Sequence, residues 1–257
     1  MVTVGLRYLN VGSRSPVYLR ELAIAAEEAG LDSLWVSDHI GPTPDVPAPL
    51  AADPRRPAVR VADPIFADPL VCLGYLAAVT ERIALGTAVL ILPLRHPRVI
   101  AMHVASLRQL SGGRVLLGVG CGWLEPEFRA LGVDFAARGR LTDRCLDMLR
   151  ADPTVAGVPL VVGGESTAAV RRALRSGDSF FPTGTGRFAL VRAVREARAG
   201  MHVTLGVRAD GLDAADAMAV ADRVVLPVRH DQGPTGPLAV RVPEDVAVAV
   251  SRLRNSG

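Results

Sequence analysis

The chain has 257 residues, 49% of them apolar and 4% aromatic, which is enough apolar material for one large domain or two small ones. All 29 basic residues are arginine, and the formal net charge is a mild +3. The absence of lysine excludes Schiff-base catalysis and a Walker-type phosphate lysine. The arginines are scattered, which disfavours a nucleic-acid-binding protein because such proteins cluster basic residues among aromatic ones.

The three cysteines, Cys72, Cys121 and Cys145, lie far apart, and no two have the spacing of a zinc site. We therefore expect no metal. Residues 1–6 lack the charged segment and cleavage site of a signal peptide, and no run reaches about 18 apolar residues. These features predict a cytoplasmic protein with reduced thiols and no membrane contact.

The first 40 residues alternate between strand and helix patterns. Residues 2–9 are predicted to form the first strand. Ser15–Pro16 then starts a helix, with Ser as the cap and Pro in the first turn, and apolar residues at helical spacing continue to Gly30. A second strand over 33–37 ends on Asp38–His39.

Residues 41–66 differ from the rest of the chain because they contain seven prolines and no clear period. A loop of this length is uncommon in a compact domain unless it covers a site. We interpret it as a lid or wall after the second strand, with a mobile surface insertion as the alternative.

The remainder of the chain continues the alternation. Further strands are predicted within 82–92, 112–123, 159–164, 178–182, 202–206 and 222–227, and further helices over 68–80, 97–110, 126–131, 138–149, 165–176, 187–198, 213–220 and 243–253. Strands that alternate with helices indicate a parallel sheet, and eight such units in about 250 residues predict a closed (β/α)8 TIM barrel. We expect a single domain over residues 1–257.

In such a barrel the site lies at the carboxyl ends of the strands. His39 follows the second strand and could move a proton near neutral pH, although a buried histidine held by Asp38 or by a backbone carbonyl is the simpler interpretation of the residue alone. After the fifth strand, Gly163 and Gly164 lead into a helix start at Glu165 and Ser166. Free N–H groups there suit a phosphate, and simple helix capping is the alternative.

Gly118, Gly120 and Gly122 occupy every second position where the fourth strand ends. Their bare backbone permits the close approach either of a flat ligand or of another part of the barrel. No nucleophile–base motif such as Gly-x-Ser-x-Gly accompanies them. A site of glycines, hydroxyls and one histidine suits a bound redox cofactor that brings its own chemistry.

Several motifs in chain order resemble the luciferase-like monooxygenase superfamily. They are the segments 25–39 (AAEEAGLDSLWVSDH), 76–89, 110–124, 135–143, 161–164 and 177–182. The segments 110–124 and 135–143 are similar to the branch of that superfamily that uses the deazaflavin coenzyme F420.

This resemblance implies a TIM barrel that binds F420, or alternatively FMN, at the carboxyl ends of its strands. It places His39 beside the reactive ring in a catalytic role. It further implies a non-proline cis peptide bond at Ala88–Val89 that supports the ring. The cofactor-binding residues it implies are Asp38, Ala88, Val89, Gly120, Cys121, Gly122, Gly163, Gly164, Glu165 and Ser166.

Three features depart from the pattern of the superfamily. The segment 150–158 is short where relatives carry a longer insertion, and the C-terminal part after Gly200 is abbreviated. Trp123 stands where sugar-phosphate dehydrogenases of the superfamily place a catalytic glutamate, which argues against that substrate class.

Three functions follow as alternatives. The leading one is hydride transfer between F420 and a small organic substrate. The second is an FMN-dependent monooxygenase, which could involve a flavin reductase as partner. The third is a degenerate barrel that serves as a non-catalytic flavin-binding or structural subunit. A homodimer is usual in the superfamily.

Overall fold

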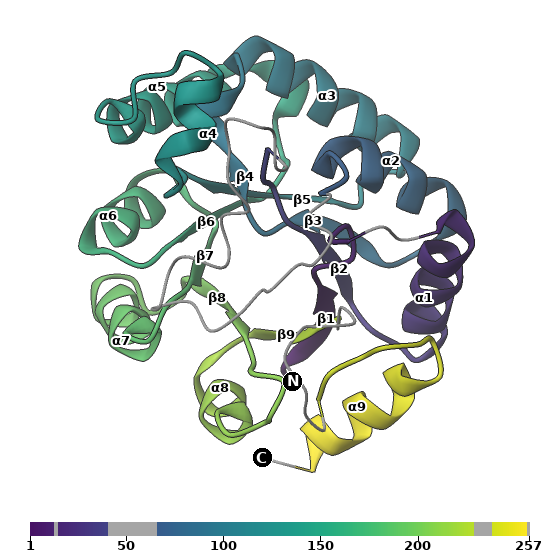
Figure 1. Ribbon diagram of the computed structural model, residues 1–257. Coiled ribbons are helices and arrows are strands. Elements are labelled where there is room, and N and C mark those ends of the chain that lie inside the picture. Colours follow the sequence, from purple (N-terminus) through teal and green to yellow (C-terminus); the bar gives the residue numbers. More distant parts are fainter. Residues whose placement is uncertain (13–14, 41–65, 229–237, 256–257) are drawn as a thin grey trace.

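The backbone closes into a barrel of parallel strands with helices on its outside (Figure 1). In this computed structural model the described residues are 1–12, 15–40, 66–228 and 238–255. The strands follow one another in the order β3-β2-β1-β9-β8-β7-β6-β5-β4, and an additional pairing of β3 with β5 completes the ring. The predicted TIM barrel is therefore confirmed.

The elements fall close to the predicted ones. The strands are β1 (Thr3–Arg7), β2 (Ser33–Val36), β3 (Ala84–Thr87), β4 (Leu90–Ile91), β5 (Val115–Gly120), β6 (Leu160–Gly164), β7 (Ser179–Pro182), β8 (His202–Gly206) and β9 (Arg223–Pro227). The α-helices are α1 (Pro16–Glu28), α2 (Pro69–Val79), α3 (Pro97–Leu110), α4 (Glu125–Ala130), α5 (Arg138–Ala151), α6 (Thr167–Ser176), α7 (Arg187–Ala197), α8 (Ala214–Val220) and α9 (Asp245–Arg254). Two short 3-10 turns are η2 (Leu92–Leu94) and η3 (Pro153–Val155).

Side-chain caps start several helices, as the sequence predicts. The Ser15 hydroxyl accepts a hydrogen bond from the Tyr18 N–H, and the Asp68 carboxylate caps α2 in the same way. Both helices have proline in the first turn, where its missing N–H costs nothing. Helix α6 begins at Thr167 rather than at 165, because Ser166 is its cap.

The predicted third strand is broken into two pieces. The peptide bond between Ala88 and Val89 is cis, as the family resemblance implied, and it separates β3 from β4. Strand β3 pairs with both β2 and β5, whereas β4 pairs only with the far end of β5. The break therefore lies at the carboxyl end of the barrel wall.

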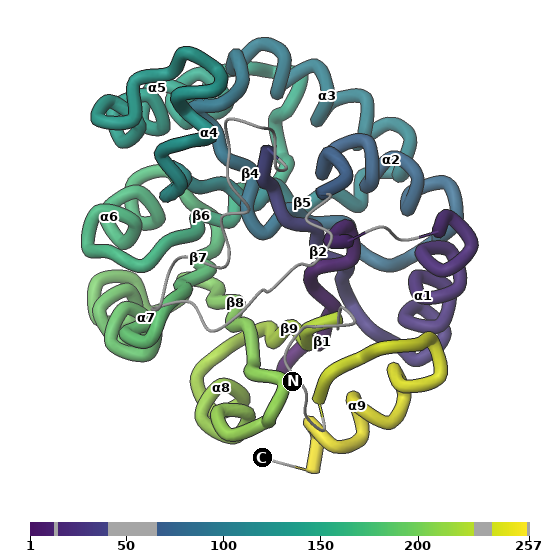
Figure 2. The backbone as a smooth tube through the Cα atoms, in the orientation of Figure 1, coloured from purple at the N-terminus to yellow at the C-terminus, as the bar shows by residue number. Residues whose placement is uncertain are grey.

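Apolar side chains fill two layers. Inside the barrel, Trp35 packs with Val161, Phe181 and Val225, and Gly86 leaves room for the indole ring. A much larger cluster lies between the strands and the surrounding helices. Helix α9 packs against α1, which brings the last helix beside the first (Figure 2).

The connection between α5 and β6 is as short as the sequence indicates, with only η3 between them. Residues 41–65 of the predicted proline-rich loop 41–66 lie outside the described residues, whereas Phe66 is described. Among the helices that the structure describes, none has the length and apolar character to cross a membrane.

We predict opposite effects of alanine at two glycines. A Cβ at Gly118 would lie 1.7 Å from the Thr87 carbonyl oxygen, so Gly118→Ala should destabilise the protein by about 3 kcal/mol or more. Gly74 lies inside α2 with open space at the Cβ position, so Gly74→Ala should stabilise it by about 1 kcal/mol. Urea unfolding followed by circular dichroism measures both. Equal stability of Gly118→Ala and the wild type would contradict the packing described.

Candidate active site at the carboxyl ends of the strands

His39, directly beyond β2, is held by a buried carboxylate. Its Nδ1 lies 2.9 Å from Oε1 of Glu127 on α4, and the same oxygen accepts the Ile40 N–H at 2.8 Å. The His39 side chain is 14% exposed, whereas that of Glu127 is completely buried. One oxygen of Glu127 thus fixes both the imidazole and the backbone that follows it.

The carboxylate selects one tautomer of the imidazole. When Nδ1 carries the proton and donates a hydrogen bond to Glu127, Nε2 of the neutral ring is the acceptor, which can take up a proton and later return it. The second oxygen of Glu127, Oε2, is buried and has no hydrogen-bond partner among the residues that the structure describes. Burying a carboxylate in this way is costly, and such groups concentrate at functional sites.

Two aromatic rings border the imidazole. The ring centroids of Phe66 and Trp123 lie 5.0 Å and 5.9 Å from that of His39, and both contacts are edge-on. These rings limit the movement of the imidazole and reduce its exposure to water. His39 is therefore fixed in place by Glu127, Phe66 and Trp123 together.

Asp38 has a structural partner in Arg95, which follows η2. The guanidinium makes two hydrogen bonds to the Asp38 carboxylate, at 2.6 Å and 2.9 Å, and a third to Asp68 at 3.0 Å. Asp38 also accepts the Ile91 N–H of β4 at 2.8 Å. Desolvation lowers the pKa of Arg95, but the two carboxylates outweigh it and hold the pKa above its ordinary value. In this arrangement Asp38 ties β4 to the end of β2.

The alternating glycines accommodate parts of the barrel itself. A Cβ at Gly120 or at Gly163 would lie 2.6 Å or 2.5 Å from a methyl group of Val89, and Gly118 faces the Thr87 carbonyl. Close packing within the barrel, one of the two explanations offered for these glycines, thus explains why a side chain is absent at each of them. The Val89 side chain occupies the hollow that the two strands leave.

Ala88 and Val89 are half-buried, although the residues on either side of them, Thr87 and Leu90, are buried. The predicted cofactor residues Cys121 and Gly122 are also half-buried, beyond the buried end of β5. Because Leu90 and Ile91 pair with Val119 and Gly120, these two groups lie on adjacent strands at the same end of the barrel.

The predicted phosphate site lies at the end of β6. Gly164 has φ +148°, and the Ser166 hydroxyl caps α6 by accepting the Ala169 N–H. Among the described residues, no acceptor is bonded to the N–H groups of Thr167 and Ala168 in the first turn. Such donors suit an anion.

Glu165 and Arg187 add opposite charges beside this turn. The Glu165 carboxylate packs against Gly184, in the loop after β7. The Arg187 guanidinium donates to the Gly184 carbonyl at 3.2 Å and forms an ion pair with Asp213. Arg187 was not among the residues predicted from the sequence, because many scattered arginines offered no way to choose it.

Glu127 is the main residue that the sequence-based prediction missed. It lies 88 residues from His39 in the chain, so no local motif joins them. One signal could have identified it: Glu127 directly precedes Phe128, and both are buried on the inner side of the short helix α4. Among the described residues no cluster of metal-ligating side chains occurs.

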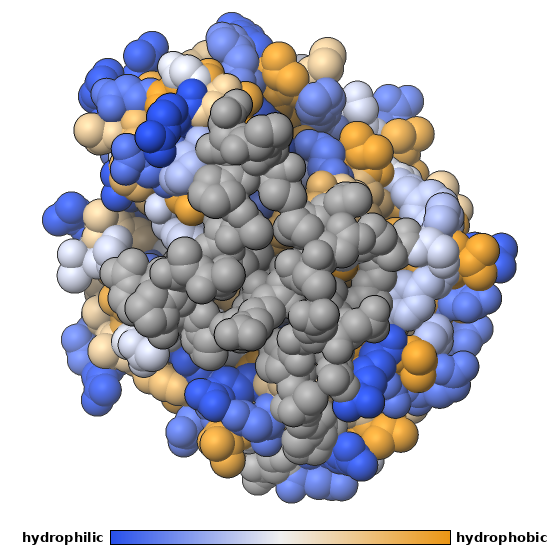
Figure 3. All heavy atoms as spheres, viewed as in Figure 1, coloured by the Kyte–Doolittle hydropathy of each residue, from blue (hydrophilic) through white to orange (hydrophobic). Residues whose placement is uncertain are grey.

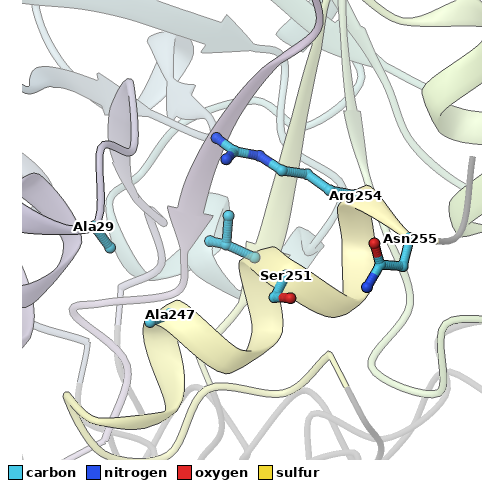
Figure 4. A pocket seen from close by; sticks show the side chains of 6 residues that line it. Ala29, Ala247, Ser251, Arg254 and Asn255 are labelled. Carbon is cyan, nitrogen blue, oxygen red and sulfur yellow. The ribbon is translucent and has the colours of Figure 1, made fainter.

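Two pockets lie on the helical layer rather than at this end of the barrel. The first is lined by Ala29, directly after α1, and by α9 residues that include Ser251 and Arg254 (Figure 4). The second lies between α3 and α5. Figure 3 shows hydrophilic and hydrophobic residues intermixed around the rim of the barrel face, with no dominant apolar patch on its coloured part.

The chain is similar in sequence to known proteins. The family model described as luciferase-like monooxygenase matches residues 4–152, more than half of the chain. An uncharacterized protein of Mycobacterium tuberculosis is 32% identical over 183 residues, which are 60% of this chain and 62% of that protein. The F420-dependent glucose-6-phosphate dehydrogenase of Beutenbergia cavernae is 35% identical over 199 residues, 67% of this chain and 54% of that enzyme.

Solved structures share the fold at low sequence identity. A monooxygenase from Streptomyces bottropensis superimposes with a TM-score of 0.67 and 15% identity, covering 98% of both chains. An F420-dependent secondary alcohol dehydrogenase gives a TM-score of 0.62 with 18% identity, covering 100% of this chain and 91% of that one. The chain spans at most about three fifths of the M. tuberculosis and B. cavernae relatives.

The cysteines provide a test of the site geometry. Burial raises the pKa of the Cys72 and Cys145 thiols to about 12, whereas Cys121 is half-buried at the end of β5. Since the thiolate is the reactive form, the native protein at pH 8 should react with Ellman's reagent at Cys121 alone. All three thiols should react in guanidinium chloride. Rapid labelling of Cys72 or Cys145 in the native protein would contradict their burial, and Cys121→Ser provides the control.

Proposed function

The chain belongs to the luciferase-like monooxygenase family, and on this premise we propose that it is an oxidoreductase that uses coenzyme F420 to transfer a hydride to or from a small organic substrate. The observation that carries the proposal is the His39–Glu127 pair. It supplies one oriented proton-transfer group at the end of the barrel where the half-buried Ala88–Val89 and Cys121–Gly122 segments lie.

The residues present fit a cofactor with a flat ring and a phosphate. Ala88, Val89 and the backbone of residues 120–122 would hold the ring, and the unpaired N–H groups at the start of α6 would hold the phosphate. Arg187 would add a positive charge there, since its guanidinium already reaches Gly184. When bound, F420 supplies or accepts the hydride.

The protein's own contribution is to position a proton-transfer group, His39, and to shield it from water. His39 would hold or deliver a proton at Nε2, because Glu127 engages Nδ1. Phe66 and Trp123 would keep water away from that proton. Trp123 also occupies the position at which sugar-phosphate dehydrogenases of this family have a catalytic glutamate, so we expect a substrate other than a sugar phosphate.

An FMN-dependent monooxygenase is the second candidate. It is supported by the 4-hydroxyprotoasukamycin monooxygenase of Streptomyces nodosus, which is 31% identical over 129 residues, 50% of this chain and 30% of that enzyme. This function would require reduced flavin, for which a separate reductase is the natural source. A third candidate is a barrel without catalytic function.

Cofactor titration distinguishes the three. We expect F420 to bind at micromolar concentration and to protect Cys121 from Ellman's reagent, because Cys121 adjoins the proposed ring site. FMN should bind at least about tenfold more weakly, which fluorescence quenching measures. Tighter binding of FMN would favour the monooxygenase, and binding of neither would leave only the non-catalytic barrel.

Variants of the proton-transfer pair test its role. In Glu127→Ala the imidazole loses its acceptor, so long-range 15N–1H NMR spectra should show a mixture of His39 tautomers in place of the single Nδ1–H form. Turnover should fall about 10- to 100-fold, and His39→Gln should reduce it by about 10²- to 10⁴-fold. Both variants should retain F420 binding.

Glu125→Ala is the matched control, because Glu125 lies on the same helix but is exposed. It should leave the tautomer, turnover and stability unchanged. A Glu127→Ala protein that keeps the Nδ1–H tautomer and full turnover would exclude Glu127 from positioning His39.

A further inference from the structure

Arg7, the last residue of β1, is a cation inside the barrel mouth. It pairs in register with Trp35 of β2, whose ring lies in the barrel interior, and residues paired across parallel strands point to the same face. On the other side, a Cβ at Gly206 of β8 would lie 2.1 Å from Nη1 of Arg7. The guanidinium therefore extends across the inside of the barrel from β1 to β8.

Three fixed contacts hold the guanidinium in this place. Nη2 donates to the Val207 carbonyl at 2.9 Å, Nη1 lies over the bare backbone of Gly206, and the Tyr8 ring centroid is 4.7 Å from Cζ. Tyr8 itself has φ +72°, an unusual backbone conformation for a residue with a large side chain. The side chain is thus positioned rather than free to swing into solvent.

No carboxylate in the part of the chain that the structure describes neutralises the charge of Arg7. Arg95, Arg187 and Arg208, which also lie near the carboxyl ends of the strands, each form ion pairs with aspartates. Among the described residues no carboxylate lies within ion-pair distance of Arg7, and its Nε is buried without a hydrogen-bond partner. Of the five N–H groups of the guanidinium, one has an acceptor among the described residues.

An uncompensated guanidinium in a partly buried position is unfavourable unless a ligand completes it. Its planar fork matches the two oxygens of a carboxylate or phosphate. The proposed ring site lies on β3 to β5 and the proposed phosphate site on β6, whereas Arg7 lies between β2 and β9, with its guanidinium over β8. Arg7 is therefore on a separate part of the barrel wall.

We propose that Arg7 binds an oxyanion of the substrate, so that the substrate is a small organic carboxylate or phosphate whose charged end lies on the β1–β8 side of the barrel. That the bound anion is the substrate rests on the proposed function, whereas anion binding by Arg7 does not require a cofactor. It names Arg7 as a residue that determines specificity.

Calorimetric titration of the cofactor-free protein with benzoate and with inorganic phosphate, at constant ionic strength, tests the site. The wild type should bind at least one of them at a single saturable site, and Arg7→Gln should weaken that binding about tenfold or more. Arg7→Lys keeps the positive charge but lacks the planar guanidinium, so its anion affinity should lie between those of the wild type and Arg7→Gln. It also supplies the comparison if Arg7→Gln does not fold.

Arg208→Gln is the matched control, because Arg208 is an exposed arginine on the same side of the barrel whose guanidinium is paired with Asp210. It removes the same charge and should leave anion binding unchanged. Failure of the wild type to bind either anion, or equal binding by Arg7→Gln or Arg7→Lys and the wild type, would overturn the proposal.

A parallel F420 titration separates the cofactor from the substrate. Arg7→Gln should bind F420 within about twofold of the wild type. A large loss of F420 affinity in Arg7→Gln would assign Arg7 to the cofactor and overturn the substrate assignment. Normal anion binding with no F420 binding in the wild type would instead reject the proposed function and leave the anion site standing.

Discussion

The contact of the Val89 side chain with Gly120 and Gly163 is the constraint on which the rest of the site depends. Two adjacent strands lack side chains where Val89 enters, and a single Cβ at either glycine would collide with its methyl groups. When the Val89 side chain occupies this position, Leu90 and Ile91 of β4 pair with β5. The barrel wall thereby extends beyond the break between β3 and β4.

That extension also fixes the end of β2. The Ile91 N–H reaches Asp38, and Arg95 closes on the same carboxylate with two hydrogen bonds. His39 follows Asp38 directly, so the position of its backbone is set before Glu127 orients its ring. Buried charge pairs contribute little net stability on average, but they can specify one arrangement. Here we regard Asp38–Arg95 as a positioning pair.

The arginines at the mouth of the barrel differ in whether an aspartate neutralises them. Because the chain has no lysine, every fixed cation at this end is a guanidinium. Arg95, Arg187 and Arg208 are each paired with an aspartate, whereas Arg7 has no carboxylate partner among the described residues. A planar guanidinium fixed against Tyr8 and Gly206 recognises the geometry of an oxyanion as well as its charge. The site therefore offers one proton-transfer group and one anion-binding group on different strands.

Local sequence signals predict most of the fold. Proline and capping residues at Ser15 and Asp68 mark helix starts correctly, because the capping interaction involves residues only three apart. The break in the predicted strand 82–92 has no such local signal, since Ala88 and Val89 are ordinary strand residues. Only the family resemblance indicated the cis bond there.

The site was less predictable because its contacts join distant segments. The sequence left two explanations open for the alternating glycines, and deciding between them required the position of Val89, which belongs to another strand. Glu127 lies 88 residues from His39 in the chain, so the two could not be linked without the fold. Arg7 could not be singled out for the same reason, because the position of its guanidinium depends on contacts with Gly206 of β8 and with Val207.

A crystal structure of the protein with F420 would show whether the Val89 segment forms the ring site. We expect the deazaflavin ring in contact with Val89 and the backbone of residues 120–122, with the phosphate at the start of α6 and His39 Nε2 facing the ring. Density for F420 at any other part of the molecule, or a ring that does not touch the Val89 segment, would contradict this expectation.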